Sequence, residues 1–212
     1  MKTIGRLHVL TDTALQSRFT HLELTEMAIS GGADTIQLRQ KTGSTRELIK
    51  TATEMRRLCA KKGATFIVND RIDVAIASEA DGVHLGQDDF PIPLARKLLG
   101  KDRIVGGSAA TLEEMENCIR EGADYVGFGP IYPTGSKNDA GPVSGIDFLK
   151  RIVLTTSLPV IAIGGIDKNN ASHVMGSGAQ GIAVISAVCC RDYPQEAARE
   201  LHDAVHENVL HG

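Results

Sequence analysis

The sequence predicts an α/β fold, a single (β/α)8 TIM barrel that spans residues 1–212. Short apolar runs alternate along the chain with segments in which apolar residues recur at helical spacing. There are eight such runs in 212 residues, and eight strand–helix units make a closed parallel barrel. Runs rich in Val and Ile that helices separate are typical of parallel strands buried on both faces.

The eight predicted strands share one design, because each apolar run is followed at once by Gly or by a polar residue. In chain order they are residues 6–11, 35–38, 65–68, 82–85, 103–106, 125–128, 159–163 and 181–185. Between them, pairs such as Leu48 with Met55 and Leu112 with Met115 predict amphipathic helices. Since the strands of such a barrel all run in one direction, we expect the residues directly after them to gather at one rim.

Four similar short segments precede predicted strands. They are residues 32–36, 79–83, 122–126 and 178–182, and three of them begin Gly-Ala. Gly can take the left-handed conformation that ends a helix, and Ala is small enough for a tight turn into the next strand. We interpret these segments as helix-to-strand turns at the opposite rim, and not as part of a site.

Composition narrows the class of protein. The formal net charge of −3 argues against a broad surface for nucleic acid or anionic membranes, which favours small-molecule substrates. The four cysteines show no Cys-x-x-Cys spacing, which argues against a metal knot or a disulfide framework. No run approaches the roughly 18 apolar residues of a membrane span, and residues 1–10 lack a signal-peptide core. We expect a cytoplasmic protein that binds neither nucleic acid nor membranes; a homo-oligomer is left open.

Two carboxylates come after neighbouring predicted strands. Asp70 comes after the third run, and Asp89 lies just beyond the fourth. If both side chains face the barrel mouth, they suit Mg²⁺, which takes few protein oxygens and completes its coordination with water and phosphate oxygens. The alternative is that both residues cap the next helices along the chain.

Cationic side chains are expected at the same rim. Arg39 and Lys41 come after the second run, and Lys137 lies in the loop after the sixth. Guanidinium and ammonium groups both bind phosphate oxygens, so three of them at one mouth are suited to a diphosphate. Each of these residues taken alone can equally belong to a solvated surface.

Hydroxyls and glycines mark a second candidate anion site. Thr134, Gly135 and Ser136 lie in a loop that could hold a phosphate. Gly165 and Ser186 come after the seventh and eighth runs, where barrels often bind phosphate. The alternative for the glycines is a structural role in tight turns.

Other polar residues give weaker signals. Ser108 comes after the fifth run, where its hydroxyl can join the site or cap the next helix. His8, His21, His84 and His173 are scattered, and none forms a recognisable nucleophile motif with Ser or Cys. We therefore interpret these histidines as structural or solvent-facing.

Six ordered motifs resemble the thiamine phosphate synthase family, and they extend over nearly the whole chain. They are residues 37–41 (Gln-Leu-Arg-Gln-Lys), 69–71 (Asn-Asp-Arg), 84–89 (His-Leu-Gly-Gln-Asp-Asp), 129–137 (Gly-Pro-Ile-Tyr-Pro-Thr-Gly-Ser-Lys), 163–166 (Ile-Gly-Gly-Ile) and 185–187 (Ile-Ser-Ala). Together these motifs are highly specific.

The resemblance implies a barrel enzyme that joins hydroxymethylpyrimidine diphosphate to hydroxyethylthiazole phosphate, releasing diphosphate and forming thiamine phosphate with Mg²⁺. It also implies a dissociative course without a catalytic base, in which the thiazole nitrogen attacks after the diphosphate has begun to leave. By this likeness, Asp70 and Asp89 hold Mg²⁺. The pyrimidine diphosphate is held by Gln37, Leu38, Arg39, Gln40, Lys41, Asn69, Ser108 and Lys137, and the thiazole phosphate by Thr134, Gly135, Ser136, Gly165, Ile185 and Ser186. The expected catalytic residues are Arg39, Lys41, Ser108 and Lys137.

Three positions depart from the usual family pattern. Gln40 stands where Glu is usual, Ser136 where Thr is usual, and Ala110 where many relatives carry His. A sister family, the thiazole tautomerases, resembles this chain but relies on that His for proton transfer, so Ala110 argues against an isomerase. The other alternative is a catalytically silent paralogue that binds thiazole phosphate; loss of Lys137 or of an Asp would favour it, and neither is lost.

Overall fold

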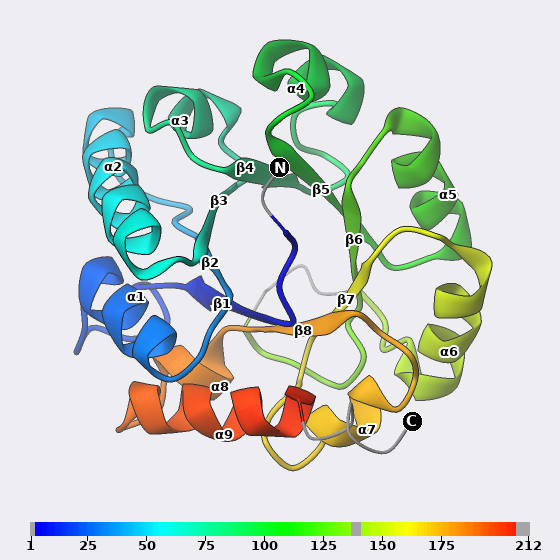
Figure 1. Ribbon diagram of the computed structural model, residues 1–212. Coiled ribbons are helices and arrows are strands. Elements are labelled where there is room, and N and C mark those ends of the chain that lie inside the picture. The colour runs from blue at the N-terminus through cyan, green and yellow to red at the C-terminus, as the bar shows by residue number, and fades with distance from the viewer. Residues whose placement is uncertain (1–2, 137–140, 207–212) are drawn as a thin grey trace.

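The computed structural model describes residues 3–136 and 141–206. In this part of the chain, eight parallel strands close into a barrel in sequence order, and helices surround it (Figure 1). The strands are β1 (Leu7–Thr11), β2 (Thr35–Leu38), β3 (Thr65–Asn69), β4 (Gly82–Leu85), β5 (Ile104–Ala109), β6 (Tyr125–Phe128), β7 (Val160–Ile163) and β8 (Gly181–Val184). The predicted (β/α)8 TIM barrel is confirmed.

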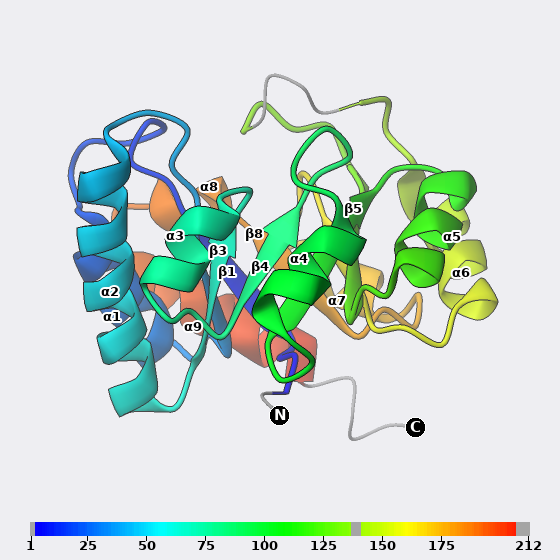
Figure 2. The same ribbon diagram turned by 90° about the horizontal axis from the view of Figure 1, so that it is seen from above.

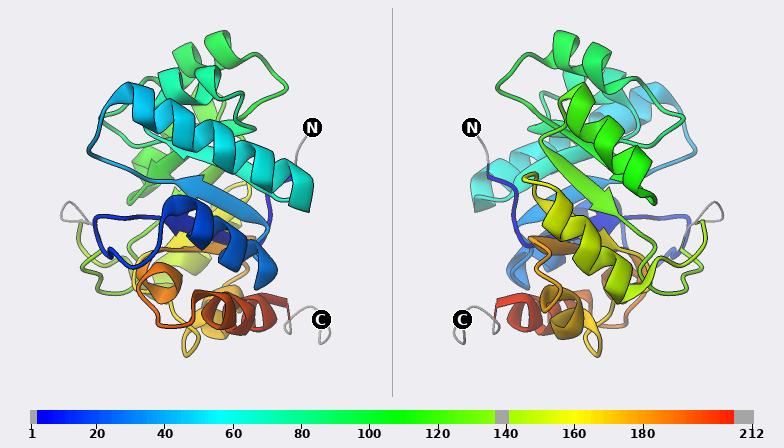
Figure 3. Two further views of the ribbon diagram at one scale, coloured as in Figure 1. Left: turned by 90° about the vertical axis from the view of Figure 1, so that its left-hand side faces the viewer. Right: turned by 90° about the vertical axis from the view of Figure 1, so that its right-hand side faces the viewer.

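Helices come after every strand and form the outer ring. They are α1 (His21–Ser30), α2 (Thr45–Lys62), α3 (Ile72–Ala77), α4 (Ile92–Leu99), α5 (Leu112–Glu121), α6 (Gly145–Thr155), α7 (Ala171–Met175), α8 (Ser186–Cys189) and α9 (Pro194–His206). The last of them, α9, packs against α1, α7 and α8 and so completes the ring (Figure 3). Among the described residues, no helix combines the length and the apolar character needed to cross a membrane. None of the four cysteines, which all lie in the described part of the chain, is joined in a disulfide bond.

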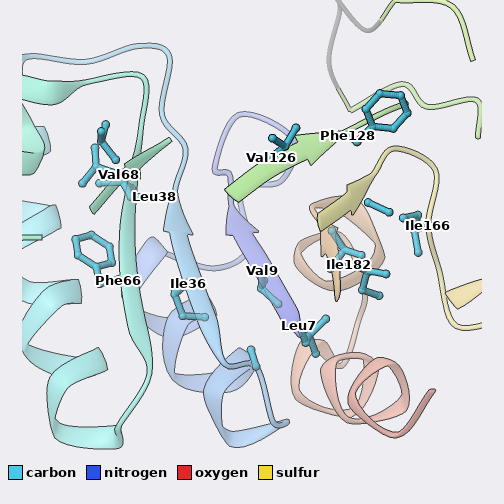
Figure 4. Packing of buried hydrophobic residues seen from close by; sticks show 14 of the residues in the cluster. Leu7, Val9, Ile36, Leu38, Phe66, Val68, Val126, Phe128, Ile166 and Ile182 are labelled. Atoms are coloured by element: carbon cyan, nitrogen blue, oxygen red, sulfur yellow. The ribbon is translucent and has the colours of Figure 1, made fainter. Parts of the chain in front are cut away.

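Side chains on the strands alternate between two cores, because successive residues of a strand face opposite sides. On β1 and β2, Leu7, Val9, Ile36 and Leu38 point outward into the core between barrel and helices (Figure 4). The barrel interior holds a smaller apolar cluster, made of Leu10, Ile67, Ile104, Tyr125, Ile161, Ala183 and Ile185. Polar side chains that share the inward phase therefore lie on the barrel axis or at its mouth.

The two rims have different roles, and Figure 2 shows the strand-to-helix loops along one of them and the helix-to-strand turns along the other. Three glycines of the four repeated segments have positive φ, as the turn interpretation requires. The Asp34 carboxylate accepts hydrogen bonds from the backbone N–H groups of Arg6 and Leu7, both at 2.9 Å. Asp81 and Asp124 bind N–H groups near the starts of β3 and β5 in the same way. These segments therefore tie neighbouring strands together.

β5 runs three residues further than the sequence predicts, to Ala109. Gly106 and Gly107 look like the end of a strand because Gly weakens strand structure. In the barrel, however, a Cβ on Gly106 would lie only 2.3 Å from Cζ of Tyr125. The longer strand places Ser108 within β5, and Thr111 caps α5 instead, its hydroxyl accepting from the Glu114 N–H at 3.2 Å. The capping alternative for Ser108 is therefore wrong.

Candidate active site

The two predicted metal-binding carboxylates lie side by side at the strand-to-helix rim. Asp70 comes directly after β3 with a positive φ of 63°, and its N–H donates to the His84 carbonyl of β4 at 2.8 Å. The Asp89 carboxylate accepts from the Gly86 N–H at 2.7 Å, in the loop after β4. Neither residue caps a helix, because the N-caps are Arg71 in α3 and Pro91 in α4. The capping alternative for Asp70 and Asp89 is therefore wrong.

The electrostatics of the carboxylate pair suit a divalent cation. Burial raises the pKa of the Asp70 carboxyl, the Lys41 ammonium lowers it, and the facing Asp89 carboxyl raises it again, so that the net direction is upward. Two neighbouring carboxylates carry negative charge that a hard cation neutralises, and their oxygens are the donors Mg²⁺ prefers. No cluster of three or more metal-ligating side chains occurs in the described ranges. The residues present therefore fit an ion that keeps most of its coordination positions for water and substrate.

Among the described residues, Lys41 is an exposed cation at the mouth. Its Nζ lies 2.5 Å from Oδ2 of Asp70, and about half of its side chain is exposed. An exposed lysine can change partners at little cost, because such surface pairs contribute only about 0–1 kcal/mol. The ammonium can therefore turn from Asp70 to an incoming anion.

Arg39 is held differently. Its guanidinium Nη1 donates to the Asp12 carboxylate, and both side chains are buried, with 11 % and 3 % exposed. Asp12 also accepts from the N–H groups of Ala14 at 2.8 Å and Leu15 at 3.3 Å, so it orders the loop after β1. Arg39 Nε is buried without a hydrogen-bond partner among the described residues. Sequence reasoning missed Asp12, although it is the polar residue directly after the first apolar run.

Gln40 is occupied by the loop between β1 and α1. The Thr13 hydroxyl donates to its Oε1 at 3.2 Å, and His21 Nε2 bonds to the same oxygen. Thr11 Oγ1 lies 2.8 Å from the other ring nitrogen of His21, and burial lowers the pKa of this histidine. His21 is thus a buried structural partner of Gln40, at the position where the family usually has Glu.

Gln37 and Leu38 illustrate the alternation of β2. Gln37 is buried on the barrel axis, where it lines a cavity together with His84 and Ser108, and its Oε1 has no hydrogen-bond partner among the described residues. Because an unsatisfied buried acceptor is costly, this oxygen is suited to a ligand donor. The Leu38 side chain points to the helices and does not reach the mouth (Figure 4). Asn69 ends β3 beside His84 of β4.

A row of three hydrogen-bonded side chains forms one wall of that cavity. His84 Nδ1 lies 2.9 Å from the Tyr125 hydroxyl, and His84 Nε2 lies 2.9 Å from Ser108 Oγ. The solvent-facing alternative for His84 is wrong, since the ring is buried, and its bond to Ser108 links it to a candidate site residue. The helpful signal was its inward phase on β4, one strand away from Ser108.

The candidate thiazole phosphate residues meet on the other side of the mouth. The Ser136 hydroxyl donates to Ser186 Oγ at 3.0 Å, which joins the loop after β6 to the start of α8. The Thr134 hydroxyl accepts from the Ser136 N–H at 3.2 Å. At Gly165, φ is 64° and an added Cβ would lie 2.5 Å from the Pro133 carbonyl oxygen, so this position needs Gly. Gly135 has open space around it.

Two further predicted residues are Ile185 and Lys137. Ile185 is buried and packs in the apolar cluster of the barrel interior, directly before Ser186. Lys137 lies outside the described residues, so its place at the mouth stays a prediction. The fold and this mouth together define a TIM-barrel enzyme with charged, metal-suited groups on one side of its opening and hydroxyl groups on the other.

Comparison with known proteins identifies the family. A family model described as thiamine monophosphate synthase matches residues 7–188. A thiamine-phosphate synthase of Methanocella arvoryzae is 50 % identical over 206 residues, which cover 97 % of this chain and 97 % of the relative. The corresponding protein of Chloroflexus aurantiacus is 48 % identical over 94 % of this chain and 92 % of its own. The solved structure of a thiamine phosphate pyrophosphorylase from Pyrococcus furiosus superposes with a TM-score of 0.87 at 40 % identity, covering 95 % of this chain and 96 % of that one.

The chain therefore belongs to the thiamine monophosphate synthase family. Its activity is that of a thiamine-phosphate synthase, a transferase of thiamine biosynthesis. The resemblance indicated by the six sequence motifs is confirmed, and the tautomerase and silent-paralogue alternatives are not favoured.

Proposed function

We propose that the chain, acting as one catalytic domain over residues 1–212, condenses hydroxymethylpyrimidine diphosphate with hydroxyethylthiazole phosphate to give thiamine phosphate and diphosphate. The observation that carries this proposal is the adjacency of Asp70, Asp89 and Lys41 at the same mouth as Arg39. Such a group of charges is suited to a metal-bound diphosphate.

The diphosphate half of the first substrate belongs on the side of β2 to β4. Asp70 and Asp89 would hold Mg²⁺, which supplies a Lewis acid for the oxygens of the departing diphosphate. Lys41, and Lys137 by the family resemblance, contact the phosphate oxygens, and Arg39 adds a fixed positive charge. Ser108 and Asn69 contact the same substrate from the neighbouring strands.

The pyrimidine ring belongs at the mouth, next to the small cavity on the barrel axis that Gln37, His84 and Ser108 line. Gln37 Oε1 is the buried acceptor there and suits the donor of an aminopyrimidine. We assign Leu38 and Gln40 no direct side-chain contact with the pyrimidine. The Leu38 side chain lies in the outer core, and Gln40 supports the site through His21 and Thr13.

The thiazole phosphate belongs on the side of β6 to β8. Ser136 and Ser186 bring two hydroxyls within 3.0 Å of one another. Thr134 and the glycines at 135 and 165 offer a hydroxyl and backbone N–H groups, which suit phosphate oxygens. Ile185 closes the floor beneath this site.

The reaction can be derived from this arrangement. Negative charge grows on the diphosphate as its bond to the pyrimidine methylene breaks, so the positive charges of Arg39 and Lys41 bind the transition state more strongly than the substrate. The electron-rich ring delocalises the positive charge left on the methylene. The thiazole nitrogen then attacks, and the protein contributes mainly the alignment of two bound reactants. No side-chain base is required.

An isomerase on the same barrel would need such a base. At the position where the tautomerase family carries His, this chain has Ala110, whose N–H donates to the Glu114 carboxylate at 2.6 Å. The absence of a titrating side chain at residue 110 supports the synthase over the isomerase.

Small molecules are the expected partners, since the mouth is built for anions of limited size. We expect no nucleic acid and no membrane as partners, because the net charge is −3. Four cysteines without a disulfide bond agree with a cytoplasmic location, where thiols stay reduced. A homo-oligomer remains open.

The test is a diphosphate-release assay with both substrates and Mg²⁺, with a chelator in a parallel sample. The proposal expects release that needs both substrates and stops with chelator. Release that ignores the chelator would overturn the metal assignment, and no release would overturn the synthase assignment. Asp89→Asn should shift the Mg²⁺ titration to higher concentration, whereas its exposed neighbour Asp88→Asn, the matched control, should leave the titration unchanged.

A further inference from the structure

The row Tyr125–His84–Ser108 crosses three neighbouring strands, β6, β4 and β5, inside the barrel. Both of its bonds measure 2.9 Å between heavy atoms. Two glycines leave room for the rings. A Cβ on Gly106 would lie 2.6 Å from His84 Nδ1, and one on Gly127 would lie 2.9 Å from His84 Cε1. The close fit fixes both rings in place.

The direction of these hydrogen bonds can be worked out from the buried end of the row. Tyr125 is 2 % exposed, and burial raises the pKa of its phenol, so it keeps its proton. Within the described residues, His84 Nδ1 is the hydrogen-bond partner that the structure gives this hydroxyl. If Nδ1 carried a proton itself, the phenolic proton would have no acceptor there, which is costly for a buried donor. Tyr125 therefore donates to Nδ1.

The Tyr125 hydrogen bond also decides which nitrogen of the His84 ring carries the proton. A neutral imidazole whose Nδ1 accepts carries its proton on Nε2, so Nε2–H donates to Ser108 Oγ. With one lone pair of Oγ engaged, the Ser108 O–H is free to point into the cavity. The Ser108 backbone is held as well, because Gln87 Nε2 donates to its carbonyl at 2.6 Å.

We propose that Tyr125 and His84 are positioning residues that set Ser108 as a hydrogen-bond donor to the anionic pyrimidine substrate. This inference rests on the proposed contact of Ser108 with that substrate. A donor aimed at an oxygen that gains negative charge stabilises the transition state. Tyr125 acts through two bonds and touches no reacting atom.

The direct test is the tautomer of His84 in the wild-type protein, read from ¹⁵N NMR of histidine-labelled chain without substrate. The proposal expects the proton on Nε2. A proton found on Nδ1 would overturn it. This readout needs no activity, so it stands apart from the diphosphate-release assay that tests the synthase function.

Variants test the connection to turnover. Tyr125→Phe removes the hydroxyl alone and should lower kcat about 3- to 10-fold, the range of one lost hydrogen bond, and release the tautomer preference of His84. The control Tyr193→Phe, at a surface position 72 % exposed, should change neither. In a Ser108→Ala background, Tyr125→Phe should have no further effect on kcat. Independent, multiplying losses in the double variant would overturn the proposal.

Discussion

The two sides of the barrel mouth, which we propose bind two anionic substrates, differ in their chemistry. The charged side, made of Asp12, Arg39, Lys41, Asp70 and Asp89, consists of ion pairs and adjacent carboxylates. The hydroxyl side, made of Thr134, Gly135, Gly165, Ser136 and Ser186, holds its parts with neutral hydrogen bonds and backbone turns. With the substrates placed as we propose, charged groups lie where the reaction creates charge.

This difference has a physical reason. The diphosphate gains negative charge as it leaves, so groups that respond to charge lower the barrier. The thiazole phosphate keeps its charge throughout, and a contact that is equal in substrate and transition state affects binding without raising kcat. The charged side should therefore control turnover, and the hydroxyl side should control affinity.

The largest effect is expected at the buried ion pair of the charged side. Asp12→Ala leaves the Arg39 guanidinium buried without its partner, and breaking such a pair typically costs about 3–5 kcal/mol of unfolding free energy. Urea denaturation measures this loss. The matched change on the hydroxyl side, Ser136→Ala, removes an exposed bond and should lower stability by less than about 1 kcal/mol. Equal losses would contradict the contrast between the two sides.

The free energy of unfolding should depend on pH through a buried histidine on the barrel axis, between the two sides. Burial lowers the pKa of His8 from 6.5 to about 4. A histidine with a depressed folded-state pKa favours folding when neutral, so its contribution is complete above pH 6.5 and is lost as the pH falls toward 4. This shift corresponds to about 3 kcal/mol. Unfolding free energy measured against pH should fall less steeply in His8→Gln than in the wild type.

A control for this measurement is His173→Gln, because His173 is exposed on α7. Its stability profile between pH 6.5 and 4 should run parallel to that of the wild type. A His8→Gln profile that also runs parallel to the wild type would show that His8 does not carry this pH dependence.

The next largest effect is expected on kcat, when a charge is removed from the charged side. Lys41→Met removes a charge next to the proposed leaving group and should lower kcat about 100-fold, the usual effect of losing one transition-state donor. Stability should change by less than about 1 kcal/mol, since the Lys41 side chain is half-exposed in its pair with Asp70. Steady-state kinetics and thermal unfolding give both values. A fall in stability that accounts for the lost activity would remove Lys41 from the chemistry.

The smallest effect is expected for the hydroxyl side. Ser136→Ala should raise KM for the thiazole phosphate about 3- to 10-fold and leave kcat nearly unchanged, because it removes one neutral contact. Kinetics with the thiazole phosphate varied at saturating pyrimidine diphosphate measure this split. A drop in kcat as large as that of Lys41→Met would mean that both sides take part in the chemistry, and the comparison would fail.

Much of this site could be predicted from residues close together in the sequence. Asp70 and Asp89 are found because each comes after an apolar run, and the residues beyond the strand ends of a parallel barrel gather at one rim. Gln37 and Leu38 show a limit of the same reasoning. Both belong to one motif, but the two-residue period of β2 turns Gln37 to the axis and Leu38 to the helices.

The missed residues are those whose role depends on distant partners. Asp12 meets Arg39 across 27 positions of the chain, and His84 meets Tyr125 across 41. Gly106 looks like a strand end until the Tyr125 ring is seen to occupy the space above it. Such contacts depend on which strands become neighbours and on their stagger, and local spacing contains neither.

The sequence by itself determined the eight strand–helix units, the rim that carries the chemistry and the residue types gathered there, because periodicity and turn residues act over a few positions. Only the tertiary structure decided which of those groups are paired, buried or free. Barrel closure and register bring side chains from different strands within hydrogen-bond distance. Those distances divide the mouth into a charged side and a hydroxyl side.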